Sequence, residues 1–204
     1  MFVAEGTSDL PLADIVEALF VDRGVTVRLS KPDFSLLDSV PRDVESRIAA
    51  GFRLVRGPVD VVVVHRDSDN AGYDARRGEI ERAVLSAGLA SSIIPIVPIR
   101  MTEAWLLLDE AAIRQVAGNP RGRENLKLPK VHEVEGVPDP KQLLRDCLLR
   151  AGEETGRRRE RMVKRFCQHR RQLLERLDRA GPVSKLTGWK RMVDDIERIC
   201  QEWA

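Results

Sequence analysis

The sequence predicts an α/β domain with a mainly parallel sheet flanked by helices, followed by an α-helical subdomain. Short runs rich in β-branched residues alternate with helical periodicity over the first ~100 residues, which is typical of parallel α/β domains. After Met101 the strand pattern disappears and helical segments remain. The length of 204 residues and the 43% apolar content allow a real core and exclude collagen-like and disulfide-scaffold proteins. We expect one domain over residues 1–120 and a helical basic subdomain over 121–204, packed on the first.

Four runs predict strands, at residues 2–5, 25–29, 59–65 and 93–99. The third is almost continuously apolar, which indicates a central strand covered on both faces. Pro95 disfavours a central place for the fourth. The first run has only four residues before Glu5. Two explanations stay open: an upstream start is missing from the sequence, or this is an abbreviated edge strand.

Helical periodicity fills the intervals between the strands and the rest of the chain. Pro11 suits the first turn of the first helix, and Gly24 suits its end. A polar stretch that reaches Asp139 reads as a loop or linker. The predicted helices cover residues 10–22, 41–55, 72–87, 102–116, 140–151, 157–179 and 184–203.

Charge is distributed unevenly along the chain. Residues 1–120 hold 13 basic and 18 acidic residues, a net charge of −5, whereas residues 121–204 hold 21 and 14, a net charge of +7. A basic surface attracts the backbone phosphates of a nucleic acid whatever its base sequence, so DNA or RNA is a candidate partner. The alternative interpretation is that the arginines form a solvated helix face with no ligand. The candidate phosphate-binding residues of the predicted helix 157–179 are Arg157, Arg158, Arg161 and Arg165. An aromatic content of 4% disfavours base stacking as the main binding mode.

The three cysteines are widely spaced and form no CxxC motif, which favours a reducing cytoplasm over a disulfide or zinc framework. No apolar run approaches the ~20 residues that span a bilayer, and the start lacks a basic leader. We therefore expect a cytoplasmic protein with no membrane partner.

Carboxylates follow three of the predicted strands. Glu5 begins the segment Glu-Gly-Thr-Ser-Asp that ends at Asp9, Asp67 and Asp69 flank Ser68, and Glu103 opens a helix. Because parallel strands end at one edge of a sheet, we expect these acids to meet there. Converging carboxylates repel one another unless a cation neutralises them, and their hard oxygens suit Mg²⁺ or Mn²⁺.

Each of these features also has a simpler interpretation. Asp9 is a candidate helix cap as well as a candidate ligand. Glu103 is a candidate partner of a helix dipole as well as a ligand. Arg66 and Arg100 are placed to bind phosphate or to pair with the local acids, and Lys141 is a further candidate phosphate ligand.

The pattern resembles the TOPRIM domain of topoisomerases, bacterial primases, recombination mediators, RNA maturases and overcoming-lysogenisation-defect (OLD) nucleases. The match lies at Glu5-Gly6, Asp67 and Asp69, and it covers about half of the chain. A looser likeness, carried also by Met101-Thr-Glu-Ala-Trp105 and Pro138-Asp-Pro-Lys141, extends over most of it. Through these additional segments the chain is similar to a family of small stand-alone bacterial TOPRIM-like proteins. Members of that family are often encoded beside an ATPase in phage-defence or abortive-infection cassettes.

The resemblance implies a hydrolase that cleaves phosphodiester bonds with Mg²⁺ or Mn²⁺, a nuclease acting as the effector of a defence system. Glu5, Asp67 and Asp69 are then the catalytic and metal-binding triad. Glu103 joins the catalytic set, and Asp9 and Glu103 serve a second metal or its shell. Two alternatives stay open: an RNA-processing maturase, and a non-catalytic toxin or binding module that acts through a partner ATPase. A generic nucleotide-binding fold ranks last, since no Gly-rich phosphate loop follows any strand. Whether the protein is an oligomer also stays open.

Overall fold

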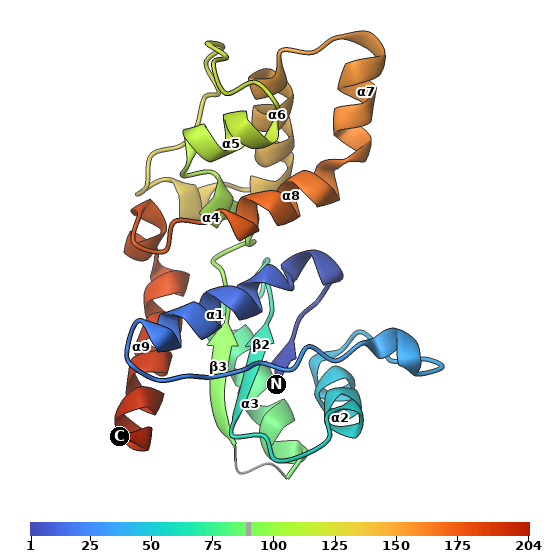
Figure 1. Ribbon diagram of the computed structural model, residues 1–204, viewed down its shortest axis with the longest axis vertical. Coiled ribbons are helices and arrows are strands. Elements are labelled where there is room, and N and C mark those ends of the chain that lie inside the picture. Colours follow the sequence, from blue (N-terminus) through green and yellow to red (C-terminus); the bar gives the residue numbers. More distant parts are fainter. Residues whose placement is uncertain (89–90) are drawn as a thin grey trace. The chain divides into compact units, whose positions relative to one another are not determined.

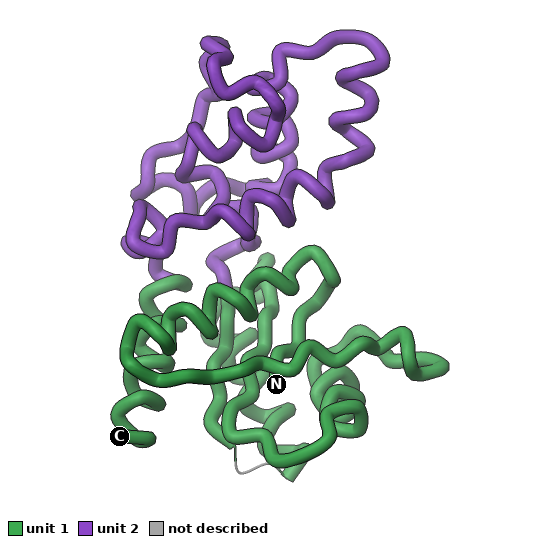
Figure 2. The backbone as a smooth tube through the Cα atoms, viewed as in Figure 1, with its two compact units in different colours: residues 1–97, 188–204 green, residues 98–187 purple. Residues whose placement is uncertain are grey.

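The computed structural model describes residues 1–88 and 91–204. The chain forms two compact units, one of residues 1–97 with 188–204 and one of residues 98–187 (Figure 2). The first unit is mixed α/β with a small parallel sheet, and the second is helical. These units differ from the sequence-based division at residue 120, because the chain leaves the first unit after Val97 and returns to it at Gly188.

The sheet consists of β1 (Phe2–Val3), β2 (Val61–His65) and β3 (Ser92–Ile96), in that order and all parallel. Phe2 pairs with Val63, and Val63 in turn pairs with Ile94. The predicted central position of the 59–65 run is confirmed, since β2 lies between the other two and all five of its residues are buried. Pro95 lies in β3, at an edge of this sheet.

The prediction of a strand at residues 25–29 is wrong. The segment carries no strand assignment, although the Phe2 amide donates a hydrogen bond to the Ser30 carbonyl (2.8 Å). The Leu29 amide instead donates to the Glu17 carboxylate (2.6 Å). Since β1 is only two residues long, it offers too short an edge for a further ladder.

Helices cover both faces of the sheet (Figure 1). Helix α1 (Pro11–Val21) lies on one face, and α2 (Val44–Leu54) and α3 (Tyr73–Ser86) lie on the other. The last helix, α9 (Thr187–Trp203), joins this unit through hydrogen-bonded ion pairs and a ring stack. Arg77 donates two hydrogen bonds to Asp195 (2.7 and 3.0 Å), and the ring of Trp203 stacks on that of Phe20 at a centroid distance of 5.8 Å. The C-terminal helix therefore completes the sheet unit.

The second unit contains α4 to α8. Where the sequence predicted one helix over 102–116 there are two, because the Asp109 carboxylate accepts a hydrogen bond from the Ala112 amide (2.9 Å) and starts a new helix. The predicted helix over 157–179 is likewise divided, at Arg165. The bounds are α4 Glu103–Leu106, α5 Glu110–Val116, α6 Pro140–Gly152, α7 Gly156–Lys164 and α8 Phe166–Glu175.

Single-turn 3-10 helices complete the assignment, at Thr7–Asp9, Phe34–Leu36, Val134–Gly136 and Pro182–Lys185. Over residues 1–88 and 91–204, no helix combines the length and the apolarity that a bilayer crossing requires.

Candidate functional site

Glu5 follows β1 directly, and α2 fixes the backbone around it. The Arg47 guanidinium of α2 donates hydrogen bonds to the carbonyl oxygens of Ala4 and Glu5, the second at 2.7 Å. Arg47 also lies over the Phe34 ring, 5.7 Å from its centroid. Sequence reasoning missed Arg47, because nothing in its neighbourhood marks an arginine that will reach back to the end of another strand.

His65 ends β2 and joins two of the predicted acids. Its Nε2 lies 3.4 Å from Asp67 Oδ1, and its Nδ1 lies 3.8 Å from Asp9 Oδ2. The imidazole is fully buried and Asp9 is buried, while Asp67 retains some exposure. Helix α1 has Leu10 at its N-cap, with no side-chain cap bond from that residue. The Asp9 carboxylate therefore lies beside the end of β2.

The loop after β2 presents its two aspartates from a tight turn. The Ser68 carbonyl accepts hydrogen bonds from the amides of Ala71 (3.1 Å) and Gly72 (3.2 Å). Asp69 has φ = 46°, in the left-handed region that aspartate tolerates better than most residues. Its carboxylate lies 4.0 Å from the Arg76 guanidinium of α3. The turn leaves Asp69 accessible to solvent.

Arg66 lies between the ends of β1 and β2 as a counter-charge. Its Nη1 donates to Glu5 Oε1 at 2.5 Å, and its Nη2 lies 3.8 Å from Glu79 of α3. Its own amide donates to the Ile96 carbonyl (3.0 Å), which fixes the residue against the end of β3. Arg66 therefore pairs with local acids, the simpler of its two sequence-based interpretations.

The pKa of Glu5 reports how closely the acids are gathered. Burial raises it above its usual range, and the negative charges of Asp67 and Asp69 raise it further. The positive charges of His65 and Arg66 act in the opposite direction. Asp67 and Asp69 therefore lie near enough to Glu5 for their charges to act on it.

The donor chemistry of this edge fits a hard divalent cation, since Glu5, Asp9, Asp67 and Asp69 supply only carboxylate oxygens. Their present arrangement does not complete a coordination shell. Within residues 1–88 and 91–204, no three His, Cys, Asp or Glu side chains are grouped so that they could hold a metal ion. Arginine and histidine partners occupy the acids instead.

Other predicted site residues belong to the helical unit. Glu103 is buried at the start of α4 and accepts a hydrogen bond from Arg170 Nε of α8 at 2.9 Å. Arg100 has a left-handed backbone (φ = 66°), and Lys141 is exposed in the first turn of α6. The four predicted arginines, Arg157, Arg158, Arg161 and Arg165, are all exposed on α7 or directly after it.

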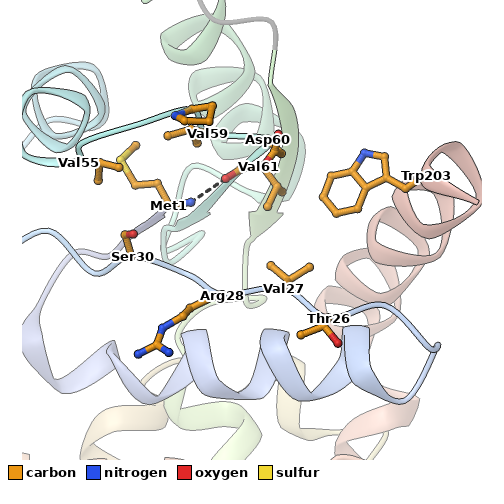
Figure 3. Close-up of a pocket in the computed structure, with 11 residues that line it drawn as sticks. Met1, Thr26, Val27, Arg28, Ser30, Val55, Val59, Asp60, Val61 and Trp203 are labelled. Carbon is orange, nitrogen blue, oxygen red and sulfur yellow. Dashed lines mark hydrogen bonds between the residues drawn. The ribbon is translucent and has the colours of Figure 1, made fainter.

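A separate cavity of about 460 Å³ lies at the opposite end of β2 (Figure 3). Asp60 and Val61, at the start of that strand, line it together with Met1 and Trp203, and the Met1 amine donates to the Val61 carbonyl (2.7 Å). Asp67 follows the other end of the strand, and a five-residue strand spans about 16 Å. The cavity is therefore distinct from the acidic edge.

Comparisons with known proteins add no relative: no family model matches the chain, and neither do any curated protein or solved structure.

Proposed function

We propose that the chain is a divalent-metal-dependent nuclease of the TOPRIM type, with its site at the carboxyl edge of β1 and β2. The observation that carries the proposal is the raised pKa of Glu5, which burial raises most and the negative charges of Asp67 and Asp69 raise further. Carboxylates that are gathered and partly desolvated carry an electrostatic cost, which a divalent cation offsets. The same carboxylates occupy the positions of the TOPRIM resemblance.

Mg²⁺ or Mn²⁺ bound here would neutralise a non-bridging phosphate oxygen and lower the pKa of a water molecule. Asp67 and Asp69 are the proposed ligands, and Asp9 adjoins them through His65. His65 is the positioning residue, because its buried ring contacts both Asp9 and Asp67.

Glu5 is the proposed proton acceptor. A general base works best when its pKa approaches the operating pH, and burial together with the neighbouring acids shifts Glu5 in that direction. Arg66 donates to Glu5 before substrate binds. When a phosphodiester enters, the Arg66 guanidinium can donate its hydrogen bond to a phosphate oxygen instead of to Glu5. This exchange would free Glu5 to take a proton from water.

A cleavage panel tests this proposal. Supercoiled DNA, linear DNA, single-stranded DNA and structured RNA are each incubated with Mg²⁺, Mn²⁺ or EDTA. The wild type should cut at least one substrate with metal and none with EDTA, and Asp67→Ala/Asp69→Ala should not cut. Asp60→Asn is the matched control, since it removes a carboxylate at the other end of β2. Cutting that survives in the double variant would refute the site.

One observation favours a second candidate, a non-catalytic nucleic-acid-binding module. The exposed cations of α7, including Arg157 and Arg161, form a surface for phosphates that needs no metal. In that case Arg157→Glu/Arg161→Glu should abolish binding to duplex DNA or structured RNA, while Asp67→Asn should have no effect on function. A preference for structured RNA in the cleavage panel would instead indicate the maturase alternative. Action through a partner ATPase in phage defence remains a proposal from the resemblance.

A further inference from the structure

An apolar groove lies inside the helical unit, between α6, α7 and the start of α8. It has a volume of about 350 Å³, at the lower end of the range for binding pockets. Its floor and walls are mainly apolar side chains. The groove is lined by Gln142, Arg145, Leu148, Leu149, Met162, Val163 and Phe166.

Two contacts involve side chains that line the groove. Met162 of α7 fills the space over Gly152 of α6, where an added Cβ would lie 2.6 Å from the Met162 sulfur. At the α8 end, the Arg145 guanidinium covers the Phe166 ring at 4.6 Å from its centroid. Between these contacts Val163 is 56% exposed. A concave, mainly apolar lining with a few polar groups is typical of a binding site.

Two arginines lie at the groove or beside it, Arg145 and Arg159. Residues 156–165 hold six arginine or lysine residues and one acid, Glu160, but only part of this charge lies on the groove side of α7. Arg145 lines the groove, and Arg159 lines a neighbouring cavity that shares Leu149 with it and also contains Glu153 and Glu154. Arg158 lies 3.6 Å from Glu154, but for Arg159 and Arg145 the described part of the chain offers no carboxylate within 4.0 Å. A negatively charged ligand could therefore pair with Arg145 and Arg159 without breaking an existing ion pair.

The two faces of α7 differ. Arg159, Met162 and Val163 fall on the groove side at helical spacing, whereas Arg157, Arg161 and Lys164 fall on the opposite side. A nucleic-acid backbone can use the second face, but it has no aliphatic side chains to fill the groove. An amphipathic helix with acidic flanks offers both apolar anchors and carboxylates.

We propose that this groove docks an acidic amphipathic helix of a partner protein. Apolar residues of that helix, one turn apart, would enter between Leu149, Val163 and Phe166. Its carboxylates would pair with Arg145 and Arg159 on either side. The proposal concerns a partner surface and is independent of whether the carboxylate site of the other unit is catalytic.

Two labelled peptides test this by fluorescence anisotropy. The first is a helical peptide with leucine at every third or fourth position and glutamate at most others; the second has the same composition with the amphipathic order destroyed. The full-length protein should bind the first about tenfold more tightly than the second. Equal affinity would show that charge alone is recognised and would overturn the proposal, as would the absence of binding.

Matched variants separate the groove from the outer face. Val163→Asp and Arg145→Glu/Arg159→Glu should each lower the affinity for the amphipathic peptide about tenfold. Arg157→Glu/Arg161→Glu makes the same change in charge as the other double variant, but its affinity should stay within about threefold of the wild type. Thermal melts verify that each variant folds. Wild-type affinity in Val163→Asp would overturn the proposal. Loss of duplex DNA binding in that variant, with the peptide unaffected, would assign the groove to nucleic acid instead.

Discussion

Two glutamate–arginine pairs, one in each unit, show how environment decides what a carboxylate can do. Glu103 and Arg170 join α4 to α8 with their side chains only 4% and 7% exposed, at 2.9 Å. Glu5 and Arg66 are closer, at 2.5 Å, but 32% and 22% exposed. In addition, Asp67 and Asp69 act on Glu5. The first pair is sealed between helices, whereas the second stands at a strand edge that solvent, a cation or a phosphate can reach.

The comparison teaches that an acid found at a predicted site position is not yet a site residue. A buried ion pair is a costly arrangement that breaks only at a large loss of stability. A half-exposed pair with competing charges can exchange partners at low cost. The predictions below test whether the two pairs differ in this way.

The largest expected effect is on folding. Arg170→Ala should lower the free energy of unfolding by about 3 to 5 kcal/mol, because it leaves the Glu103 carboxylate buried without this counter-ion. Its neighbour Arg171 pairs with Glu175 on the exposed face of α8, so Arg171→Ala is the control and should cost less than about 1 kcal/mol. Urea unfolding measures both. Equal losses would contradict the contrast between sealed and open pairs.

Changing the half-exposed Glu5–Arg66 pair should alter the affinity for Mn²⁺. Arg66→Gln removes the cation that occupies Glu5, so Mn²⁺ should bind this variant about three- to tenfold more tightly than the wild type, as measured by calorimetry. The same change should raise the pKa of Glu5 further, since Arg66 lowers it. Arg76→Gln, which removes a cation from beside the exposed Asp69, should have a smaller effect. Weaker Mn²⁺ binding in Arg66→Gln would show that the guanidinium supports the site.

The smallest effect concerns pH. Because folding raises the pKa of Glu5 above its usual value of 4.5, the protonated carboxyl favours the folded state, and that contribution is lost as the pH rises through the folded pKa. Glu5→Gln should therefore gain stability relative to the wild type as the pH rises from about 4.5 through the folded pKa of Glu5, while its amide oxygen still accepts from Arg66. Urea melts across this range test it, and parallel curves for the two proteins would contradict it.

Much of the site follows from the sequence because strand ends can be recognised locally. The apolar run ending at His65 predicts β2, and parallel pairing then brings Asp67 to the edge beside Glu5. What could not be predicted depends on contacts distant in sequence. Arg47 reaches Glu5 from α2, 42 residues away, and Asp195 of the last helix receives Arg77, 118 residues away.

Two errors in the fold have a similar cause. Residues 25–29 have the composition of a strand, but a strand requires a partner, and the two-residue β1 is too short to provide a ladder. The helix predicted over 157–179 is interrupted at Arg165, where the backbone leaves the helical region (φ −92°, ψ 9°). Local propensity is compatible with one continuous helix, and the break becomes apparent only in the tertiary structure.

The proposed function requires that the carboxyl edge of β1 and β2 binds a divalent cation. Its most direct test is titration of the wild type, Asp67→Asn and Asp60→Asn with Mn²⁺, followed by electron paramagnetic resonance. We expect saturable binding by the wild type, the same affinity in Asp60→Asn, and at least about tenfold weaker binding in Asp67→Asn, which loses one anionic ligand. Equal affinities in all three proteins, or no binding by the wild type, would contradict the account.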